Sequence, residues 1–494
     1  MKKEPRFETK LSPFKHQTEA FLAIKELDYA AIFHEQGLGK TKIAIDLAIY
    51  WLKNKFVETI IIVAKRALIK NWIDELAIHN YFKPSIIGTS SSKNYIVFNS
   101  QRRLILTHYE AVKKEEKRLK LYLKTRKTGV FLDESTKIKN PNSALTKSFF
   151  QLSNLFTKRI IMSGQPVANR PYDIWAQIKF LDFGEHLGND FKSFKKDNDL
   201  SNDLEENVAA QCDFTENLNA IWPKISSFSI RETKKNSSIE LPEKLYETIY
   251  SEWEPKQLRL YNEVRDLLSV SVLKDGKIVE DSSEEILKRL LRLVQIASNP
   301  ALIDDGYETT PGKVANLTTI VNKIISQNEK CIVWTSFVKN ADYLSNYLSD
   351  YGTCKVHGKL SHEIRNKSLE SFKNNAEKKV LIATPGAAKE GLTLTNANHV
   401  IFFDRTFSLD DYLQSQDRIH RISQKKTCHV YVLLMKDSID EWVDALIETK
   451  YAASMFAQGD YSSFEEFNET ISFSFSSMLK NVLAPSNSLL LETK

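Results

Sequence analysis

An eight-residue stretch, His34–Thr41 (HEQGLGKT), constrains the fold of this chain more than any other segment. It follows a short apolar run, Tyr29–Phe33, and it opens an amphipathic run, Lys42–Lys53. This pattern predicts a strand, a glycine loop and a helix. A loop that ends in Gly-Lys-Thr at a helix start offers backbone N–H groups, a lysine charge and a hydroxyl to a bound anion. We therefore expect a phosphate site in this loop.

Each position of the loop has an expected part in holding a nucleotide. Lys40 adds a point charge, and the Thr41 hydroxyl is placed to ligate Mg²⁺. The usual pattern of such loops opens with glycine, whereas His34 stands at that position here. The nucleotide-binding residues expected from the loop are His34, Glu35, Gln36, Gly37, Leu38, Gly39, Lys40 and Thr41.

Length and composition favour a chain of several domains inside the cell. The 494 residues are 42% hydrophobic and 27% charged, which is too much chain for one ordinary core. A net charge of +6 is compatible with nucleic acid without diagnosing it. No apolar run approaches the ~18 residues of a membrane span, and the charged N-terminus does not resemble a signal peptide. We expect a cytoplasmic protein, associated with the nucleoid in a prokaryote or located in the cytoplasm of a phage-infected cell, that does not contact membranes.

The spacing of the cysteines also favours an intracellular protein. Four cysteines lie far apart, without the paired spacing of a zinc site or a disulfide framework. They indicate a reduced protein without structural zinc. These residues are Cys212, Cys331, Cys354 and Cys428.

Short apolar runs alternate with helical patterns in both halves of the chain. Runs that are apolar on both faces are typical of buried parallel strands. In the first half the expected strands are Tyr29–Phe33, Thr59–Val63, Leu104–Thr107, Val130–Asp133 and Ile160–Ser163. In the second half they are Cys331–Thr335, Val380–Thr384, His399–Asp404 and Val430–Leu434. The alternation predicts an α/β fold with a doubly wound parallel sheet, present twice.

The middle of the chain is more helical and more polar than either half. We expect a helical insertion on each side of a connector near Arg231–Lys244. The expected domains are a first lobe over residues 1–230 with a helical protrusion at about 172–228, a connector with a second protrusion over 231–311, a second lobe over 312–450, and a tail over 451–494.

Two local patterns give narrower expectations. In Val270–Val279, Asp-Gly lies between apolar runs, which predicts a hairpin. In the tail, Ile471–Phe475 alternates strictly and fits a strand, a docking segment or no ordered structure. The tail and the helical insertions are where we expect a protein partner to bind.

Asp133 and Glu134 end the apolar run GVFLD. Carboxylates at the carboxyl end of a parallel strand face the ligand crevice of an α/β sheet. In combination with the phosphate loop, this position predicts that Asp133 holds Mg²⁺ and that Glu134 takes a proton from the attacking water. The alternative is a solvated acidic pair at a strand end.

Two further segments are candidates for the same site. Gln17, before the first strand, has an amide that can both donate to and accept from an adenine edge, although it also fits an ordinary surface glutamine. Ser163, Gly164 and Gln165 follow the strand RIIMS and suit a sensor of phosphate, or a plain strand-to-loop turn.

The second half has no glycine phosphate loop and carries QSQDRIHRISQ at Gln414–Gln424 instead. Arg418 and Arg421 are three residues apart, so on a helix they would share one face. An arginine pair aimed across a cleft can stabilise the charge of a phosphate in transfer. The alternative is a solvated face of mixed charge.

These motifs together resemble the Swi/Snf-type ATPases, a branch of the superfamily-two helicase-related proteins. About ten motifs agree in order over roughly residues 11–445. The segments of the first half that carry the resemblance are FKHQ at 14–17, HEQGLGKT, Ile60–Glu75, Leu104–Glu110, Asp133–Pro141 and SGQP with Asn169. Those that follow are Arg231–Lys235, Leu241–Lys244, Leu290–Leu302, Ile332–Phe337, His357-Gly358, Leu381–Leu394 and QSQDRIHRISQ.

The chain departs from the family pattern at positions beside the expected phosphate and metal residues. Ser135 and Thr136 replace the usual Ala/Gly-His, Gln165 replaces a threonine, and Thr393 and Ser423 each replace a glycine. The residues expected to touch phosphate and metal all match, namely Lys40, Thr41, Asp133, Glu134, Arg418 and Arg421. We therefore expect an active enzyme.

The resemblance implies two RecA-like lobes that bind ATP and Mg²⁺, with the nucleotide between the lobes. It adds Gly391 to the expected ATP contacts and Gln414 to the coupling residues Ser163, Gly164 and Gln165. It also implies a duplex DNA track contacted through the phosphate backbone, where hydroxyls, amides and cations position the protein without reading bases. The expected contacts are Lys65, Arg66, Thr107, His108, Thr335, Ser336, Lys339, His357 and Thr384.

The leading expectation is a DNA-stimulated ATPase that translocates along duplex DNA as a monomer, without strong strand separation. A strand-separating DNA or RNA helicase is the first alternative. An ATP-gated, non-catalytic DNA-binding scaffold is the second. The intact acid pair and both arginines argue against the scaffold.

Overall fold

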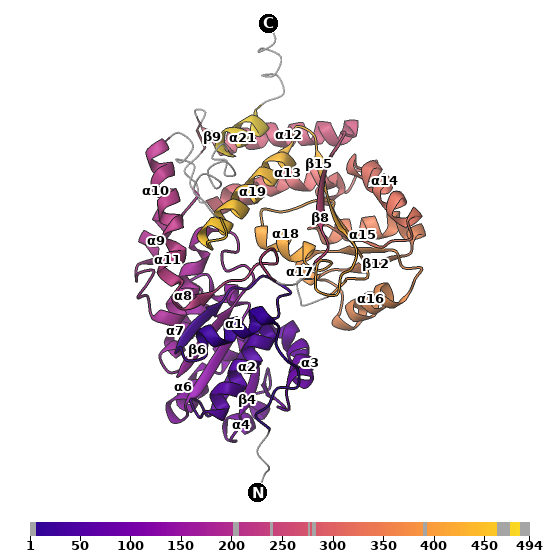
Figure 1. Ribbon diagram of the computed structural model, residues 1–494. Coiled ribbons are helices and arrows are strands. Elements are labelled where there is room, and N and C mark those ends of the chain that lie inside the picture. The colour runs from indigo at the N-terminus through magenta and orange to yellow at the C-terminus, as the bar shows by residue number, and fades with distance from the viewer. Residues whose placement is uncertain are drawn as a thin grey trace. The chain divides into compact units, whose positions relative to one another are not determined.

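The computed structural model describes residues 6–200, 207–237, 241–274, 277–278, 283–388, 393–461 and 475–484 (Figure 1). The chain divides into two compact units. The first comprises residues 1–200, 209–240 and 453–462, and the second comprises residues 201–208, 241–452 and 463–494. Within the described residues, no helix is both long and apolar enough to cross a bilayer.

A parallel sheet of seven strands forms the centre of the first unit, in the order β3-β4-β2-β5-β6-β1-β7. Every neighbouring pair is parallel, which confirms the doubly wound sheet expected from the apolar runs. The strands are β1 (Tyr29–Ile32), β2 (Thr59–Ala64), β3 (Ser85–Ile87), β4 (Leu104–His108), β5 (Thr128–Asp133), β6 (Lys158–Met162) and β7 (Ser229–Ile230).

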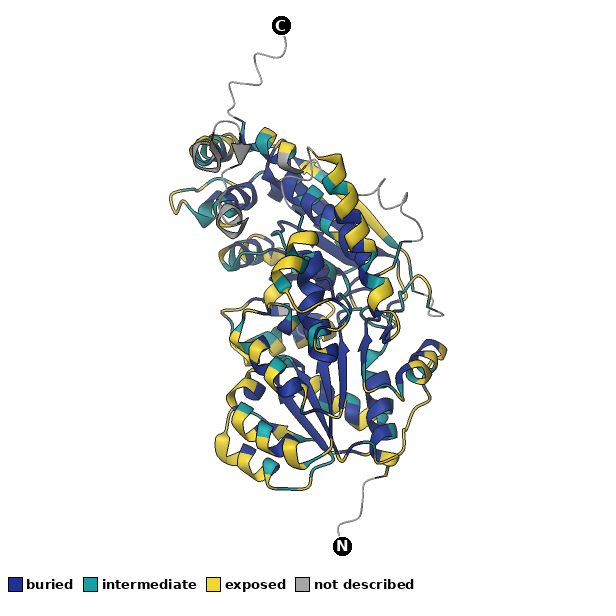
Figure 2. Ribbon diagram, turned by 90° about the vertical axis from the view of Figure 1, so that its left-hand side faces the viewer, coloured by how far each residue is buried: buried dark blue, intermediate teal, exposed yellow. Residues whose placement is uncertain are grey.

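Helices connect these strands, and Figure 2 shows the strands buried while the helices are exposed on one side. Those before β6 are α1 (Lys15–Ile24), α2 (Lys40–Lys53), α3 (Ile69–His79), α4 (Ser91–Phe98), α5 (Tyr109–Lys114), α6 (Glu116–Thr125) and α7 (Ala144–Ser153). Those after β6 are α8 (Trp175–Asp182), α9 (Phe191–Asp197), α10 (Val208–Asn219) and α11 (Ile221–Ile225).

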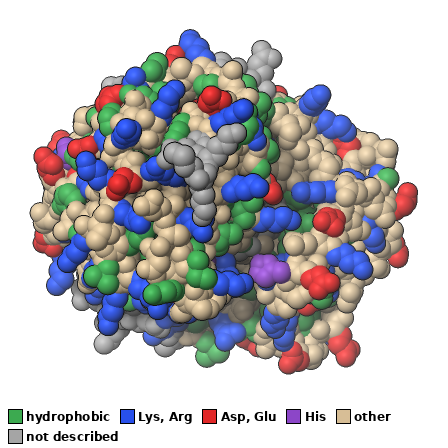
Figure 3. Space-filling model, turned by 90° about the horizontal axis from the view of Figure 1, so that it is seen from below, with side chains coloured by type: hydrophobic (Ala, Val, Ile, Leu, Met, Phe, Trp, Pro, Cys, Tyr) green, Lys and Arg blue, Asp and Glu red, His purple; other side chains and the backbone are tan. Residues whose placement is uncertain are grey.

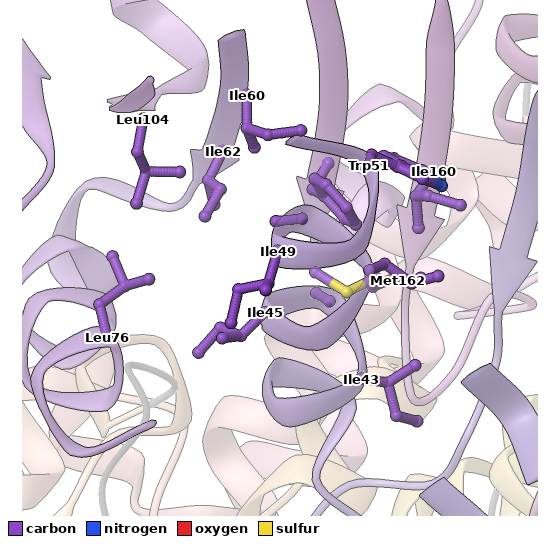
Figure 4. Packing of buried hydrophobic residues seen from close by; sticks show 14 of the residues in the cluster. Ile43, Ile45, Ile49, Trp51, Ile60, Ile62, Leu76, Leu104, Ile160 and Met162 are labelled. Carbon is purple, nitrogen blue, oxygen red and sulfur yellow. The ribbon is translucent and has the colours of Figure 1, made fainter. Parts of the chain in front are cut away.

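The helix that follows the phosphate loop is packed firmly onto the sheet. Ile43, Ile45, Ile49 and Trp51 of α2 lie in one buried cluster with side chains of β2, β4 and β6 (Figure 4). The Trp51 ring stacks on Phe131 of β5 at a centroid distance of 5.3 Å. This packing fixes the start of α2, and with it the loop, relative to the strand ends.

The second unit also contains a parallel sheet, of six strands in the order β12-β13-β11-β14-β15-β8. It confirms the second α/β sheet; five of its strands follow the second helical insertion, and β8 precedes it. The strands are β8 (Lys244–Ser251), β11 (Cys331–Trp334), β12 (Thr353–Val356), β13 (Val380–Ala383), β14 (His399–Phe402) and β15 (Cys428–Met435).

Helices of the second unit include those of the helical insertion expected after the connector. They are α12 (Pro255–Val272), α13 (Ser283–Ser298), α14 (Lys313–Ser326), α15 (Val338–Tyr347), α16 (His362–Asn374), α17 (Pro385–Ala388), α18 (Leu409–Gln416), α19 (Ile439–Ala457) and α21 (Phe475–Leu483). The chain passes from the second unit into the first within α19, since residues 453–462 belong to the first.

The two local predictions have different outcomes. The hairpin is present but short, with β9 (Leu273–Lys274) antiparallel to β10 (Lys277–Ile278), because α12 continues to Val272. Asp275 and Gly276, on which the hairpin prediction rests, lie outside the described residues. In the tail, 471–474 also lies outside them, and Phe475 begins α21.

Candidate functional site

The loop between β1 and α2 has the backbone that its glycines predict. Gly37 and Gly39 have φ values of 91° and 74°, a left-handed region that strains other residues. Gly39 is the residue that caps α2, and Lys40 and Thr41 form the first turn of that helix. The first N–H groups of a helix have no partner within it, so they are available to an anion.

The Lys40 ammonium group lies inside the curve of this loop. Its Nζ donates hydrogen bonds to the carbonyl oxygens of His34 (2.8 Å) and Glu35 (3.2 Å). Burial lowers the pKa of Lys40, whereas the charges of Glu134 and Asp133 act in the opposite direction. The lysine, the acid pair and the loop therefore form one electrostatic cluster.

Gln17 packs directly against the same loop. A Cβ atom placed on Gly39 would lie only 2.1 Å from Gln17 Nε2, so the glycine is also needed for this close approach. The Gln17 side chain is buried, donates to the carbonyl of Leu38 at 3.4 Å and accepts from the Phe14 N–H at 3.0 Å. The amide is thus held beside the loop, and its contact with a nucleotide stays a prediction.

His34, which stands where such loops usually have glycine, is buried beneath the loop. Burial and the nearby Lys40 charge lower the pKa of His34 to about 3, so the ring is neutral. The ring hydrogen-bonds with the Ile230 backbone, which acts against this shift. The backbone carbonyl of His34, rather than its ring, contacts Lys40.

Asp133 is the last residue of β5, and two groups from neighbouring elements hold it. The indole Nε1 of Trp72, on α3, donates to Asp133 Oδ2 at 2.8 Å. The hydroxyl of Tyr109, at the start of α5, donates to the Asp133 carbonyl at 2.8 Å. Burial, followed by the charge of Glu134, raises the pKa of Asp133 to about 6, so a cation beside it would be favoured.

Glu134 has a backbone conformation that is rare for its residue type. Its φ and ψ are 54° and 56°, in the left-handed region. Such residues cost free energy and cluster at functional sites. The Glu134 carboxylate lies 3.9 Å from the ammonium nitrogen of Lys65, and both side chains are less than one-fifth exposed.

The turn after β6 also reaches the phosphate loop, because β6 is the parallel neighbour of β1. The Ser163 N–H donates to the carbonyl of Ile32 at 3.1 Å. A Cβ atom on Gly164 would lie 2.8 Å from Gln36 Cγ and 3.3 Å from Lys40 Nζ. The structure therefore brings Ser163 and Gly164 close to Lys40. We call the expected coupling residues 163–165 the coupling turn.

An arginine from the connector joins these two turns. Arg231 Nη1 donates to the carbonyls of Phe33 (2.6 Å) and Gly164 (3.5 Å). The same guanidinium makes a two-pronged ion pair with Asp460, and both side chains are 5% exposed. Sequence reasoning placed Arg231 only in the connector, since its partner is 229 residues away.

Asp460 belongs to a C-terminal segment, residues 453–462, that is part of the first unit. Gln165, in the coupling turn, donates from Nε2 to Ser454 Oγ at 2.6 Å, and Ser454 donates to the Val167 carbonyl at 3.0 Å. Gly459 has a φ of 74°, and a Cβ atom there would lie 2.7 Å from the Trp222 ring. The segment is therefore built into the first unit.

The expected DNA contacts of the first unit lie at the carboxyl ends of β2 and β4. Lys65 and Arg66 follow β2, and Arg66 is exposed. His108 ends β4 and contacts Glu110 at 3.0 Å. Thr107 is 1% exposed, and its hydroxyl donates to the carbonyl of Ile87 at 3.0 Å, so that hydroxyl is already engaged within the unit.

The expected DNA contacts of the second unit also include both buried and exposed side chains. Asp404 accepts hydrogen bonds from the Thr335 hydroxyl and from the Ser336 N–H, each at 2.6 Å. The Thr335 side chain is buried. His357 is buried and contacts Asp342 at 3.2 Å. Lys339 is exposed and pairs with Asp305, and Thr384 is buried at the end of β13.

The expectation that Arg418 and Arg421 share a helix face is wrong. The helix α18 ends at Gln416, and both arginines lie in the turns that follow it. The Leu394 N–H donates to the Arg418 carbonyl at 2.9 Å, and this bond competes with the one that the carbonyl would accept in a further helical turn. Arg421 donates to the hydroxyl of Thr393 at 2.8 Å.

Two other expected residues belong to the second unit. Gln414 is buried on α18, where it donates to Asp410 Oδ1. Gly391 lies outside the described residues.

Comparison with known proteins points to the same family as the sequence motifs. Residues 29–302 match the family model of the SNF2-related domain, and residues 312–423 match that of the helicase conserved C-terminal domain. An uncharacterized ATP-dependent helicase of Mycoplasma pneumoniae is 29% identical over 83% of this chain and 38% of its own length. The putative ATP-dependent helicase/translocase YwqA of Bacillus subtilis is 27% identical over 91% of this chain and 49% of its own length.

The chain thus spans less than half the length of these two relatives. Among solved structures, the SWI2/SNF2 ATPase core of Sulfolobus solfataricus in complex with dsDNA is 24% identical, with a TM-score of 0.42, and covers 95% of this chain and 99% of its own. The SNF2-related model alone matches more than half of the 494 residues. The chain belongs to the SNF2-related family.

Proposed function

We propose that this chain is a double-stranded-DNA-stimulated ATPase that couples ATP hydrolysis to translocation along duplex DNA. Its output would be the remodelling or displacement of bound proteins or branched structures, without strong strand separation. The observation that carries the proposal is the cluster of Lys40, Asp133, Glu134 and Gly164 around one phosphate loop.

Each residue of the cluster has a chemical task in this proposal. The loop N–H groups and Lys40 hold the β- and γ-phosphates, and Glu134 accepts the proton of the attacking water. Thr41 and Asp133 supply a hydroxyl and a carboxylate oxygen, which are the donors that Mg²⁺ prefers, and the N–H of Trp72 orients that carboxylate. Bound Mg²⁺ would supply charge neutralisation of the phosphates. Arg418 and Arg421 would stabilise the charge of the phosphate in transfer.

The charges of the chain are compatible with a polyanionic partner. The net charge is +6, and Lys and Arg side chains are spread over the face seen in Figure 3, with fewer acidic ones among them. Arg66 and Lys339 are exposed at the expected contact positions. Contacts of this kind neutralise phosphates without reading bases, so DNA affinity is expected to fall steeply with salt.

One ATPase titration with duplex DNA, single-stranded DNA and RNA tests the substrate class. We expect weak hydrolysis without nucleic acid and strong stimulation by duplex DNA. Stimulation by RNA alone would contradict the proposal, and nucleotide binding with negligible turnover would favour the scaffold.

Paired displacement assays separate translocation from unwinding. We expect the chain to release the third strand of a triplex in the presence of ATP and to leave a plain duplex paired. Release of a strand from the plain duplex would instead favour a strand-separating helicase.

The Trp72 contact leads to a prediction about magnesium. Trp72→Phe keeps the buried ring but removes the N–H that orients Asp133, so the Mg²⁺ concentration for half-maximal hydrolysis is expected to rise about tenfold, as for other groups that orient metal ligands. A Mg²⁺ titration of the ATPase rate measures this. Trp175→Phe is the matched control, since the buried Trp175 N–H has no partner among the described residues. An unchanged Mg²⁺ requirement in Trp72→Phe would contradict the assignment of Asp133.

A further inference from the structure

One segment of the first unit, residues 65–72, contacts both members of the acid pair. At its start, the Lys65 ammonium nitrogen is 3.9 Å from Glu134 Oε2. At its end, the indole N–H of Trp72 donates to Asp133 Oδ2 at 2.8 Å. Both contacts are direct, since the ammonium group reaches one carboxylate and the indole N–H reaches the other. We call residues 65–72 the sensor segment.

The sensor segment also begins where a DNA backbone is expected. Lys65 directly follows β2, at the carboxyl edge of the sheet, and Arg66 beside it is exposed. The Lys65 side chain is 17% exposed, so its ammonium group is reachable from solvent without unfolding. A DNA phosphate at this edge and the Glu134 carboxylate would therefore be two anions that compete for one ammonium group.

The ion pair has the properties of a contact that can be exchanged. At 3.9 Å it is longer than a charge-assisted hydrogen bond, and partly exposed pairs of this kind are weak. Glu134, by contrast, has a left-handed backbone conformation of the kind that clusters at functional sites. If Lys65 moves away, the Glu134 carboxylate loses its cationic partner.

From this geometry we propose that Lys65 restrains Glu134 until DNA binds, and that a DNA phosphate withdraws Lys65 and frees Glu134 to accept the proton of water. Lys65 is thus a positioning residue that links the track to hydrolysis. This inference rests on the proposed function, because it explains how duplex DNA would stimulate the ATPase. It differs from a plain backbone contact, which would affect DNA affinity alone.

Steady-state ATPase assays of Lys65→Ala and Lys65→Gln, with and without duplex DNA, test the inference. We expect the DNA-free rate to rise about fivefold, the factor that corresponds to losing a partly exposed ion pair. The stimulation ratio should fall correspondingly. Lys65→Arg keeps the charge and should restore the low DNA-free rate.

Lys70→Ala is the matched control, because it removes the same charge from an exposed position of the sensor segment. Its DNA-free rate should equal that of the unmodified chain. A DNA-free rate that is unchanged or lower in both Lys65 variants, with only the DNA concentration for half-maximal stimulation raised, would overturn the inference. Absence of DNA stimulation in the unmodified chain would instead count against the proposed function, so the two failures are distinguishable.

Discussion

Replacing Glu134 with glutamine is expected to lower ATP turnover by about 10²–10⁴-fold, the usual contribution of a general base. The amide has almost the shape of the carboxylate but cannot accept the proton of water. The phosphate loop and Lys40 are unchanged, so ATP binding should persist. Single-turnover hydrolysis measured beside binding of a fluorescent ATP analogue separates the two effects.

The same change of charge at another site provides the control for Glu134→Gln. Glu116 lies on the surface helix α6 and pairs with Lys120 at 2.8 Å. Glu116→Gln should hydrolyse ATP at the normal rate. Full turnover by Glu134→Gln would remove the acid pair from the mechanism, and loss of ATP binding together with turnover would point to misfolding of the strained turn at residue 134.

Arg231→Ala is expected to destabilise the first unit by about 3–5 kcal/mol, since removing one partner of a buried ion pair leaves the other charge unpaired. The guanidinium also donates to the carbonyls of Phe33 and Gly164, so the variant should lose hydrolysis as the two turns separate. Thermal unfolding followed by circular dichroism, together with the ATPase rate, measures both.

A conservative variant and a control variant make the Arg231 test more specific. Arg231→Lys keeps a charge but cannot form the two-pronged pair with Asp460, so it should not restore stability. Lys15→Ala removes a lysine that pairs with Glu19 on the surface of α1, where both side chains are mostly exposed, and it should change stability by only about 0–1 kcal/mol. Equal melting temperatures for Arg231→Ala and Lys15→Ala would contradict the structural role assigned to Arg231.

Sequence reasoning identified the strands that are apolar on both faces and missed those that are not. The nine expected runs all correspond to strands of the two sheets. The missed strands include β8, whose side chains at Leu245, Tyr246 and Tyr250 are exposed at a sheet edge. β3 and β7 are two or three residues long, which is too short for a periodic pattern.

The candidate site was predictable where one local motif carries the chemistry. The phosphate loop, the acid pair and the turn at Gly164 meet because β1, β5 and β6 are neighbours with parallel carboxyl ends. Trp72 was not identified as a site residue, because a tryptophan at helical spacing is normally interpreted as part of the hydrophobic core. Its side chain is indeed only 1% exposed. The helix expected to carry Arg418 ends early, since a tertiary contact to Leu394 competes with the next helical turn.

The C-terminal segment of the first unit has a consequence for biosynthesis. Asp460 is made 229 residues after Arg231, which at ordinary rates of translation is a delay of roughly 10–50 s. During that interval the nascent first unit carries a guanidinium group whose carboxylate does not yet exist. Final consolidation of the phosphate-binding half must therefore wait until the ribosome has produced the entire second sheet.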